Sequence, residues 1–471
     1  MPSDATPDRS GARESSPAFD VGLLSPVSVG HDALVADQAV LDALVAVEVA
    51  LARAYGSLGV APAAVVDDIS TALGWQGNGR GCLGHRVDAV VLAAASVSGG
   101  NPVIPLVAEL KARVPESARR WVHRGATSQD ILDSALMLVS YRAGRAILAH
   151  LRRVEVELAT FARTHAEDVG AARTLTQHAV PTTVGLRAAV WLRGVRRATD
   201  RLEAAVTHLP AQLGGAGGTL AAIVEIAGAD AAARLASPFA GALGLAVPDA
   251  PWHTNRWPVT ELGDALVQAI DAVGKIATDI ATLSRTEIGE LAEGAAGGSS
   301  AMPQKRNPSG SVLIRSAALR APQLGATLHL AAALAADERP DGSWHAEWPT
   351  LRELLRLALG AAATSARVVA GLSVDSAAVA RNLAQTGALI VSERLSLVLV
   401  PLIGRERFDH LVAEASGGAD LADLVRALPE AADLDVDALV DPGRYLGLAE
   451  AYLDGALRER GPHGETPEVL S

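Results

Sequence analysis

The residues best suited to chemistry lie in one short stretch, residues 294–308, which reads GAAGGSSAMPQKRNP. Its first half is rich in glycine, which gives the backbone access to conformations closed to other residues. Its second half contains two prolines, which fix φ and stop helices. The flexible half carries the hydroxyls of Ser299 and Ser300, and the rigid half carries the cation Lys305 and the amide Asn307. This order predicts a catalytic loop; a plain linker between two helices is the alternative.

The tail of this stretch favours the catalytic interpretation. Residues 298–308 closely resemble the signature of the fumarase/aspartase superfamily, which reads G-S-S-x-M-P-x-K-x-N-P. The resemblance extends from about residue 34 to about residue 400. It implies an all-helical, homotetrameric lyase that removes a proton next to a carboxylate and eliminates a group from the neighbouring carbon. It also implies that Ser299 is the base.

A second segment, residues 123–130, reads HRGATSQD. Thr127 and Ser128 stand where a long helix is expected to begin, and helix N-termini present free N–H groups that favour anions. A plain helix cap would explain these residues equally well. The segment resembles the first substrate-binding segment of the superfamily, which implies that Thr127 and Ser128 bind a substrate carboxylate.

A third segment, residues 173–177, reads RTLTQ. It resembles the second superfamily segment, which reads R-T-H-x-Q in fumarases and adenylosuccinate lyases, and this makes Gln177 a predicted substrate contact. Those enzymes use the histidine on the side of the leaving group. Leu175 stands in its place and can neither donate nor accept a proton. His178 is interpreted as a capped or core histidine.

The expected chemistry needs positive groups placed in advance. Removal of a proton next to a carboxylate produces a dianionic aci form, so cations and hydrogen-bond donors must already point at that group. Lys305 and Asn307 supply one cation and one amide, and Thr127 and Ser128 add donors. The histidines lack spacings such as H-x-x-x-H, so we expect no metal and no other cofactor.

Within the superfamily, the sequence looks most like the 3-carboxy-cis,cis-muconate cycloisomerases. Two positions depart from that subgroup: Arg124 replaces an apolar residue and Gln304 replaces a histidine. An arginine binds planar oxyanions through two parallel hydrogen bonds. Arg124 would therefore suit a planar group on the substrate, and an acid on another subunit is the alternative partner.

These features leave several functions open. The preferred hypothesis is elimination from a substituted succinate to release fumarate, with nitrosuccinate as the best specific guess. Nitrite leaves without a proton, so Leu175 is no handicap, and this hypothesis resembles the nitrosuccinate lyases of secondary metabolism. The alternatives are lactonisation by a cycloisomerase, an adenylosuccinate-lyase-like activity and an inactive structural homologue. The intact Ser299, Lys305 and Asn307 disfavour the last.

The composition of the chain limits the kinds of ligand and the cellular location that we expect. The chain of 471 residues has a formal net charge of −12, which argues against nucleic acid but not against a small di- or tricarboxylate. Cys82 is the single cysteine, so no internal disulfide forms and a reducing cytoplasm is the expected location. No apolar run reaches the roughly 18 residues of a membrane span, and no signal peptide is recognisable.

The chain is expected to fold as an all-α protein of three helical domains. Long helices over residues 258–293 and 309–336 suggest a bundle core inside an oligomer. The resemblance to the superfamily implies that this oligomer is a homotetramer with sites shared between subunits. A further helix is expected to start at Pro181, and a loop is expected over residues 338–348. The proposed boundaries are a disordered tail 1–19, an N-terminal domain 20–119, a central bundle 120–372, a C-terminal domain 373–456 and a tail 457–471.

Overall fold

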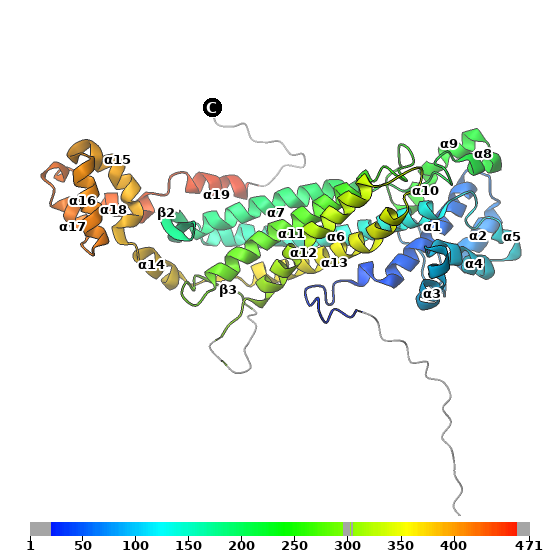
Figure 1. Cartoon of the computed structure of the whole chain (residues 1–471), viewed down its shortest axis with the longest axis horizontal. Coiled ribbons are helices and arrows are strands. Elements are labelled where there is room, and N and C mark those ends of the chain that lie inside the picture. The colour runs from blue at the N-terminus through cyan, green and yellow to red at the C-terminus, as the bar shows by residue number, and fades with distance from the viewer. Residues whose placement is uncertain (1–19, 295–301, 303–304, 459–471) are drawn as a thin grey trace, which may run out of the picture.

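The computed structural model describes residues 20–294, 302 and 305–458. Within these ranges the protein consists mainly of α-helices, which confirms the all-α fold class. The molecule is elongated, with a bundle of long helices in the middle and clusters of shorter helices at both ends (Figure 1). The division into three domains remains a prediction.

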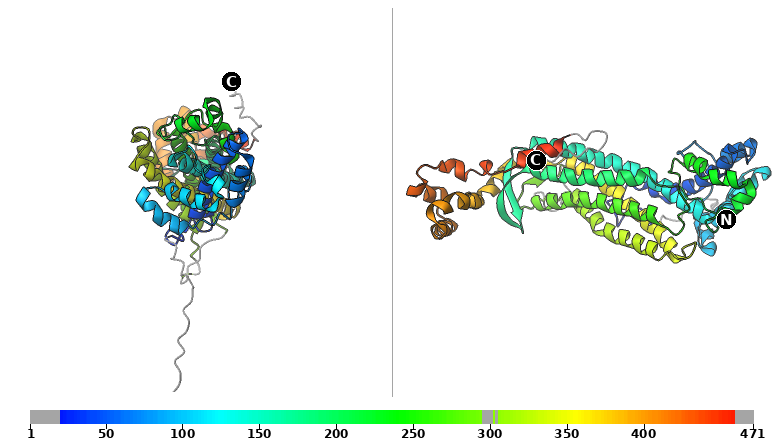
Figure 2. Two further views of the ribbon diagram at one scale, coloured as in Figure 1. Left: turned by 90° about the vertical axis from the view of Figure 1, so that its right-hand side faces the viewer. Right: turned by 90° about the horizontal axis from the view of Figure 1, so that it is seen from above.

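The long helices run side by side along the molecule (Figures 1 and 2). They are α6 (Ser128–Thr164), α7 (Val184–Thr207), α11 (Trp257–Leu283), α12 (Ser309–Ala333) and α13 (Gly342–Ala370). With 37 residues, α6 is about 55 Å long at 1.5 Å per residue. On α11, Leu262, Leu266, Ile270 and Val273 recur every three or four residues and are buried. This spacing places them on one face, which packs into the bundle.

The N-terminal end carries shorter helices, some of which pack directly on α6. They are η1 (Ala33–Val35), α1 (Asp37–Ser57), α2 (Ala63–Ala72), α3 (Ala89–Gly99), α4 (Val103–Arg113), α5 (Glu116–Arg119), α8 (Ala221–Ala227), α9 (Ala229–Arg234) and α10 (Ala236–Leu243). The longest of these helices, α1, is mostly buried and contacts both α6 and α10. One continuous hydrophobic core joins this end to the central bundle.

A buried ionic network fixes this end of the bundle. The guanidinium of Arg256, just before α11, donates hydrogen bonds to Asp133 of α6 at 2.7 and 3.1 Å. It also donates to Glu347 of α13 at 2.6 and 3.1 Å. Trp344 adds a hydrogen bond from its indole N–H to Asp133 at 2.8 Å. Because these side chains are buried and mutually paired, they set the register of three long helices.

Most of the C-terminal helices lie at the other end of the molecule, where buried residues between Ile390 and Leu439 form a second hydrophobic core (Figure 1). The C-terminal helices are α14 (Ser376–Ala384), η2 (Gly387–Val391), α15 (Ser392–Ile403), α16 (Arg405–Ser416), α17 (Leu421–Arg426), η3 (Pro429–Ala431), α18 (Val436–Val440), η4 (Pro442–Arg444) and α19 (Ala449–Leu457). The last helix returns to α7. There Arg193 donates to the carbonyl of Tyr452 at 2.7 Å, and Arg196 donates to that of Ala456. Arg196 therefore caps the carbonyl end of α19, while Arg193 contacts the middle of the helix.

Two small antiparallel sheets interrupt the helices. The hairpin of β1 (Val169–Thr174) and β2 (Gln177–Thr183) turns at Leu175 and Thr176, with φ of 47° and 72°. Positive φ at both central residues is the pattern of a type I′ turn, which normally uses Asn-Gly. The second sheet pairs β3 (Leu291–Ala292) with β4 (Ser373–Val374).

Several boundaries differ from the sequence expectations. The helix expected over residues 258–293 ends at Leu283, because the chain then turns and enters β3. Pro181 lies within β2 rather than at a helix start, and the next helix begins at Val184. The expected loop 338–348 becomes helical from Gly342. In that last case the buried packing of Trp344 and Glu347 overrides the loop-like composition.

Membrane-spanning potential is limited in the part of the chain that the structure describes. No single helix there is long and apolar enough to cross a bilayer. One pair bent by 87°, Ser376–Ala384 with Gly387–Ile403, meets the length and composition criteria only when its two members are taken together.

Candidate active site

The start of α6 is held by a buried carboxylate. Thr127 is the N-cap of the helix and forms a capping box with Asp130. The fully buried Asp130 accepts hydrogen bonds from the backbone N–H groups of Thr127, Gly214 and Gly215 at 3.0, 2.8 and 2.9 Å. His253 lies 2.8 Å from the same carboxylate. The predicted anion-binding residues therefore sit on a rigid helix start, with Ser128 as its first residue.

Arg124 lies three residues before this start and has no acidic partner among residues 20–294, 302 and 305–458. Its guanidinium stacks on the ring of Trp121, with the carbon atom Cζ 4.8 Å from the ring centroid. Its Nη1 donates to the carbonyl of Arg120 at 3.3 Å, and its Nε is buried without a hydrogen-bond partner in the described chain. Tyr55 fixes the backbone by donating to the carbonyl of Arg124 at 3.0 Å. The cation is thus positioned but not neutralised within one chain.

His123 and Glu48 form a pair that sequence reasoning missed. Nδ1 of His123 lies 2.7 Å from Oε1 of Glu48, which comes from the middle of α1. Burial alone would lower the pKa of His123, but the hydrogen bond and charge of Glu48 outweigh it, so the pKa is raised. The signal available in the sequence was an acid between Val47 and Val49, inside an otherwise apolar run over residues 43–52.

The β1–β2 hairpin carries the second predicted segment. Gln177 is the first residue of β2 and is exposed, and its amide lies 3.4 Å from the hydroxyl of Thr176. Leu175 at the turn is 96% exposed. His178 bonds through Nδ1 to the hydroxyl of Thr386 at 2.6 Å, and its pKa is lowered by burial and by Arg173. The hairpin therefore presents an apolar tip and an amide.

A second ionic cluster supports this hairpin. Glu290 is buried and accepts two hydrogen bonds from Arg173, at 3.2 and 2.5 Å, and one from Asn382 at 2.9 Å. Arg187 lies 3.8 Å from the same carboxylate, and burial lowers its pKa. Both arginines line a cavity of about 1110 Å³ that also includes Gln177. Two cations thus share one carboxylate beside a predicted substrate contact.

The signature segment is described only in part. Ser299, the predicted base, lies outside the described residues, and so does Gln304. Lys305 is exposed, and its backbone N–H donates to the carbonyl of Met302 at 3.0 Å. Asn307 is partly buried just before α12.

Glu293 joins the two flanks of this segment. Its carboxylate accepts hydrogen bonds from the backbone N–H groups of Gly310 and Ser311, at 3.0 and 2.7 Å. It also accepts one from the Ser311 hydroxyl at 2.6 Å. The start of α12 is therefore capped by a carboxylate that comes from the other side of the signature segment.

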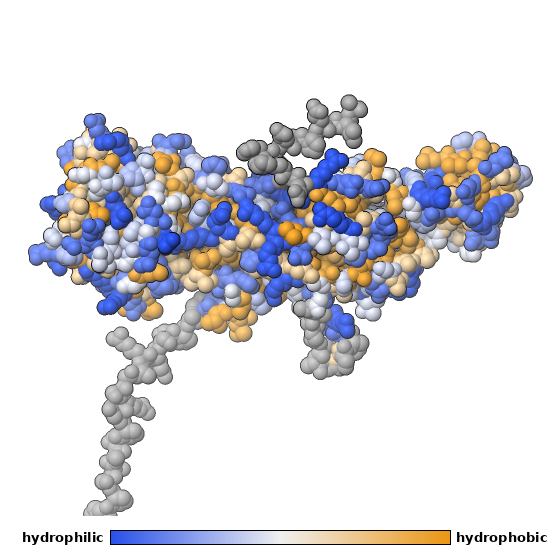
Figure 3. Space-filling view, turned by 180° about the vertical axis from the view of Figure 1, so that it is seen from behind, coloured by the Kyte–Doolittle hydropathy of each residue, from blue (hydrophilic) through white to orange (hydrophobic). Residues whose placement is uncertain are grey.

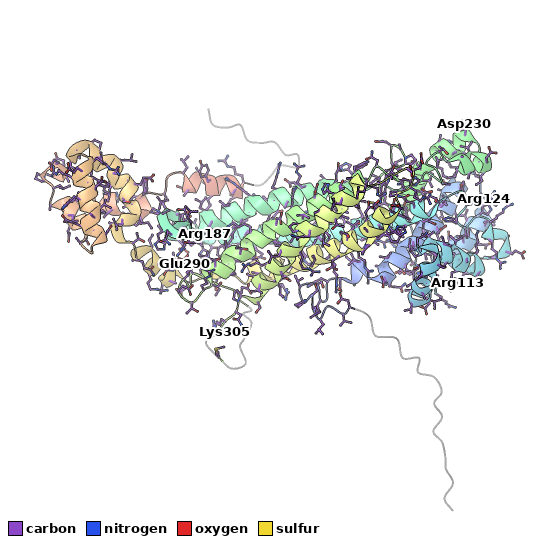
Figure 4. The ribbon with its side chains drawn as sticks, in the orientation of Figure 1. Arg113, Arg124, Arg187, Asp230, Glu290 and Lys305 are labelled. Carbon is purple, nitrogen blue, oxygen red and sulfur yellow. The ribbon has the colours of Figure 1, made fainter. Side chains whose placement is uncertain are left out.

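One chain does not gather all the predicted residues. Arg124 lies towards one end of the molecule, Arg187 and Glu290 lie towards the other, and Lys305 lies below the bundle (Figure 4). Arg124, Thr127 and Ser128 do lie together around the start of α6. In the described ranges, no group of three or more His, Cys, Asp or Glu side chains is arranged to hold a metal ion.

Comparison with known proteins decides the family. A family model described as Lyase matches residues 33–322. A nitrosuccinate lyase from Streptomyces davaonensis is 46% identical over 464 residues, covering 94% of this chain and 96% of the relative. The chain belongs to the fumarase/aspartase superfamily of lyases.

This superfamily member is similar to the cycloisomerase branch as well. A 3-carboxy-cis,cis-muconate cycloisomerase from Pseudomonas aeruginosa is 40% identical over 451 residues, covering 92% of this chain and 95% of the relative. The crystal structure of 3-carboxy-cis,cis-muconate lactonizing enzyme from Pseudomonas putida matches with a TM-score of 0.81 and 35% identity. It covers 90% of this chain and 94% of that one. The superfamily predicted from residues 298–308 is therefore confirmed.

Proposed function

We propose that this protein eliminates nitrite from nitrosuccinate and releases fumarate. The observation that carries the proposal is Arg124, a guanidinium fixed on Trp121 beside the start of α6 without an acidic partner in the described chain. A planar nitro group offers two oxygens to such a fork. The 46% identity to a nitrosuccinate lyase supports the same substrate.

The chemistry follows from the charges that must be stabilised. A base takes the proton on the carbon next to one carboxylate, and that carboxylate passes through a dianionic aci form. We assign the base to Ser299 and the stabilising cation and amide to Lys305 and Asn307. Thr127 and Ser128, with the N–H groups of the helix start, bind a substrate carboxylate. Gln177 from the hairpin adds an amide contact.

Nitrite as the leaving group is compatible with an apolar residue, Leu175, at the tip of the hairpin. Nitrite departs as a stable anion with the electron pair of the C–N bond, so it needs no proton from the enzyme. Leu175, the exposed apolar residue at the hairpin tip, could supply none. A poor leaving group such as an amine or hydroxide would require an acid at this position.

The site is proposed to be shared between subunits of a homotetramer. Arg124, the hairpin and Lys305 lie in different parts of one chain (Figure 4), which supports a site completed by other subunits. On α12, Val312, Leu319 and Leu330 are each more than half exposed, and so is Leu334 just after the helix. Apolar surface also lies along the middle of the molecule (Figure 3). Exposed apolar area of this kind favours association.

Lactonisation of 3-carboxy-cis,cis-muconate is the second candidate. It is favoured by the 40% identity to a cycloisomerase over nearly the whole chain. In that reaction a carboxylate of the substrate adds to its own double bond, so no group leaves and Leu175 is again acceptable. Arg124 has no specific role in it.

A side-by-side turnover assay tests the two functions. The purified protein receives nitrosuccinate, with nitrite and fumarate quantified, or 3-carboxy-cis,cis-muconate, with its ultraviolet absorbance followed. Equal amounts of nitrite and fumarate, lost in Ser299→Ala, are the expected result. Loss of muconate absorbance without nitrite release would overturn the proposal in favour of the cycloisomerase.

A further inference from the structure

The pair of Glu48 and His123 lies outside every role assigned above. Glu48 is 1% exposed, and its Oε1 is 2.7 Å from Nδ1 of His123. Its second oxygen, Oε2, is buried without a hydrogen-bond partner in the described chain. A buried carboxylate needs a nearby cation, so this environment favours the protonated imidazolium over the neutral ring.

The second ring nitrogen of His123, Nε2, faces away from Glu48, and the backbone of this residue is strained. His123 has φ of 58°, a conformation that is unusual for a residue other than glycine. Strained residues of this kind persist where the surrounding structure holds them, and they gather at functional sites. The side chain is 20% exposed, and Nε2 has no hydrogen-bond partner among residues 20–294, 302 and 305–458. The ring is thus oriented by Glu48 and open at Nε2.

The charged neighbours agree with a retained proton. Glu48 and Asp130 both act to raise the pKa of His123, whereas burial and Lys111 act to lower it. The net direction is upward. Arg124 is the next residue along the chain, so two cationic groups stand before the start of α6.

We propose that His123 presents an imidazolium N–H to the nitro group of the bound substrate, with Glu48 as the positioning residue. This inference rests on the proposed function. A base takes the proton, the C–H electron pair becomes the double bond of fumarate, and the C–N pair leaves with nitrite. His123 keeps its own proton and stabilises the charge that develops on the nitro oxygens, beside Arg124. The reaction therefore needs no proton donor at the position of Leu175.

The test measures the histidine and the reaction separately. Hydrogen exchange at the imidazole C2 position, read by mass spectrometry of the full-length protein, gives the titration midpoint of each histidine. Glu48→Gln removes the charge but keeps the shape. His123→Asn is a second variant, because asparagine tolerates positive φ. Asp42→Asn is the matched control, since Asp42 lies 2.9 Å from His85 in the same part of the molecule.

The expected result has two parts. In the wild type the midpoint of His123 lies above the usual value for histidine, and Glu48→Gln lowers it while Asp42→Asn leaves it unchanged. In nitrite release, kcat/KM falls as pH rises through this midpoint, and Glu48→Gln moves the fall to lower pH. His123→Asn lowers kcat by about 10- to 100-fold, the loss of one hydrogen bond to a charged group.

Different failures point to different errors. An ordinary midpoint, or one that Glu48→Gln leaves unchanged, would overturn the pair. A lowered midpoint with an unchanged pH dependence of nitrite release would overturn its role. Absence of nitrite from the wild type would overturn the proposed function and the nitro-group assignment, while the exchange data would still report on the pair.

Discussion

Glu293 and Ser311 stand on opposite sides of the signature segment and are joined by two hydrogen bonds. The carboxylate of Glu293 accepts from the backbone N–H of Ser311 at 2.7 Å and from its hydroxyl at 2.6 Å. Gly310 adds a third at 3.0 Å. This contact brings the chain that leaves β3 back to the start of α12, and it places Asn307 close to a capped helix end.

Removal of this cap should weaken both stability and turnover. Glu293→Ala leaves buried N–H groups of α12 without an acceptor, which should cost about 1–2 kcal/mol of unfolding free energy. Displacement of the signature segment should lower kcat by up to about 100-fold. Chemical denaturation and nitrite release measure the two effects. Glu261→Ala, at an exposed acid that has no ion pair in the described chain, should change neither. Equal effects at both positions would contradict the capping role.

Substitution of Arg124 should affect substrate use far more than folding. Arg124→Lys keeps the charge but loses the planar fork, so kcat/KM for nitrosuccinate should fall by about 10- to 100-fold. Arg120→Lys is the matched control, because Arg120 also stacks on Trp121, at 5.4 Å from the ring centroid. It should keep activity within about twofold. If Arg124 instead pairs with an acid of another subunit, Arg124→Gln, which removes the charge, will give a smaller assembly in light scattering.

Substitution of the two residues of the hairpin turn should raise stability and lower activity. Replacement of Leu175 and Thr176 together by Asn and Gly supplies the residues that a type I′ turn prefers. Release of the positive-φ strain should raise the unfolding free energy by about 1 kcal/mol, while loss of the apolar tip should lower nitrite release. Thermal unfolding and initial rates measure the pair of effects. An unchanged melting temperature would show that the turn stores no strain.

Stability should depend on pH through His123. Its pKa is raised in the folded state, so the stabilisation is fully present below the unfolded value of about 6.5 and is lost as pH rises through the folded pKa. Glu48→Gln should therefore destabilise the protein more at pH 6 than at pH 9. Denaturant unfolding of both proteins at the two pH values measures this difference, and a penalty that grows with pH would have the wrong sign.

Local patterns predicted most of the helical framework. The long periodic segments of α11 and α12 and the N-terminal signals at Thr127 and Asp130 were recognisable because caps and apolar spacing are local properties. The hairpin was not recognisable, since Leu175 and Thr176 are poor turn residues, and the pairing of β1 with β2 on either side holds them at positive φ.

The sequence predicted which segments carry the candidate site, but not how these segments are arranged in space. The sequence identified Arg124 and Lys305, but it could not show that they lie in different parts of the molecule (Figure 4). Glu48 and His123 were missed because they are 75 residues apart, and no local pattern links an acid in α1 to a histidine before α6. Long-range polar pairs of this kind require the packed core to bring them together.

The packing of α19 on α7 must form late during synthesis of the chain. Arg193 bonds a carbonyl that lies 259 residues further along, and at 5–20 residues per second this stretch takes roughly 13 to 52 s to be synthesised. During that time the apolar strip around Ala189, which later covers Leu453 and Ala456, has no cover from its own chain. The packing of α7 against α19 therefore completes only after the C-terminal helices have been synthesised.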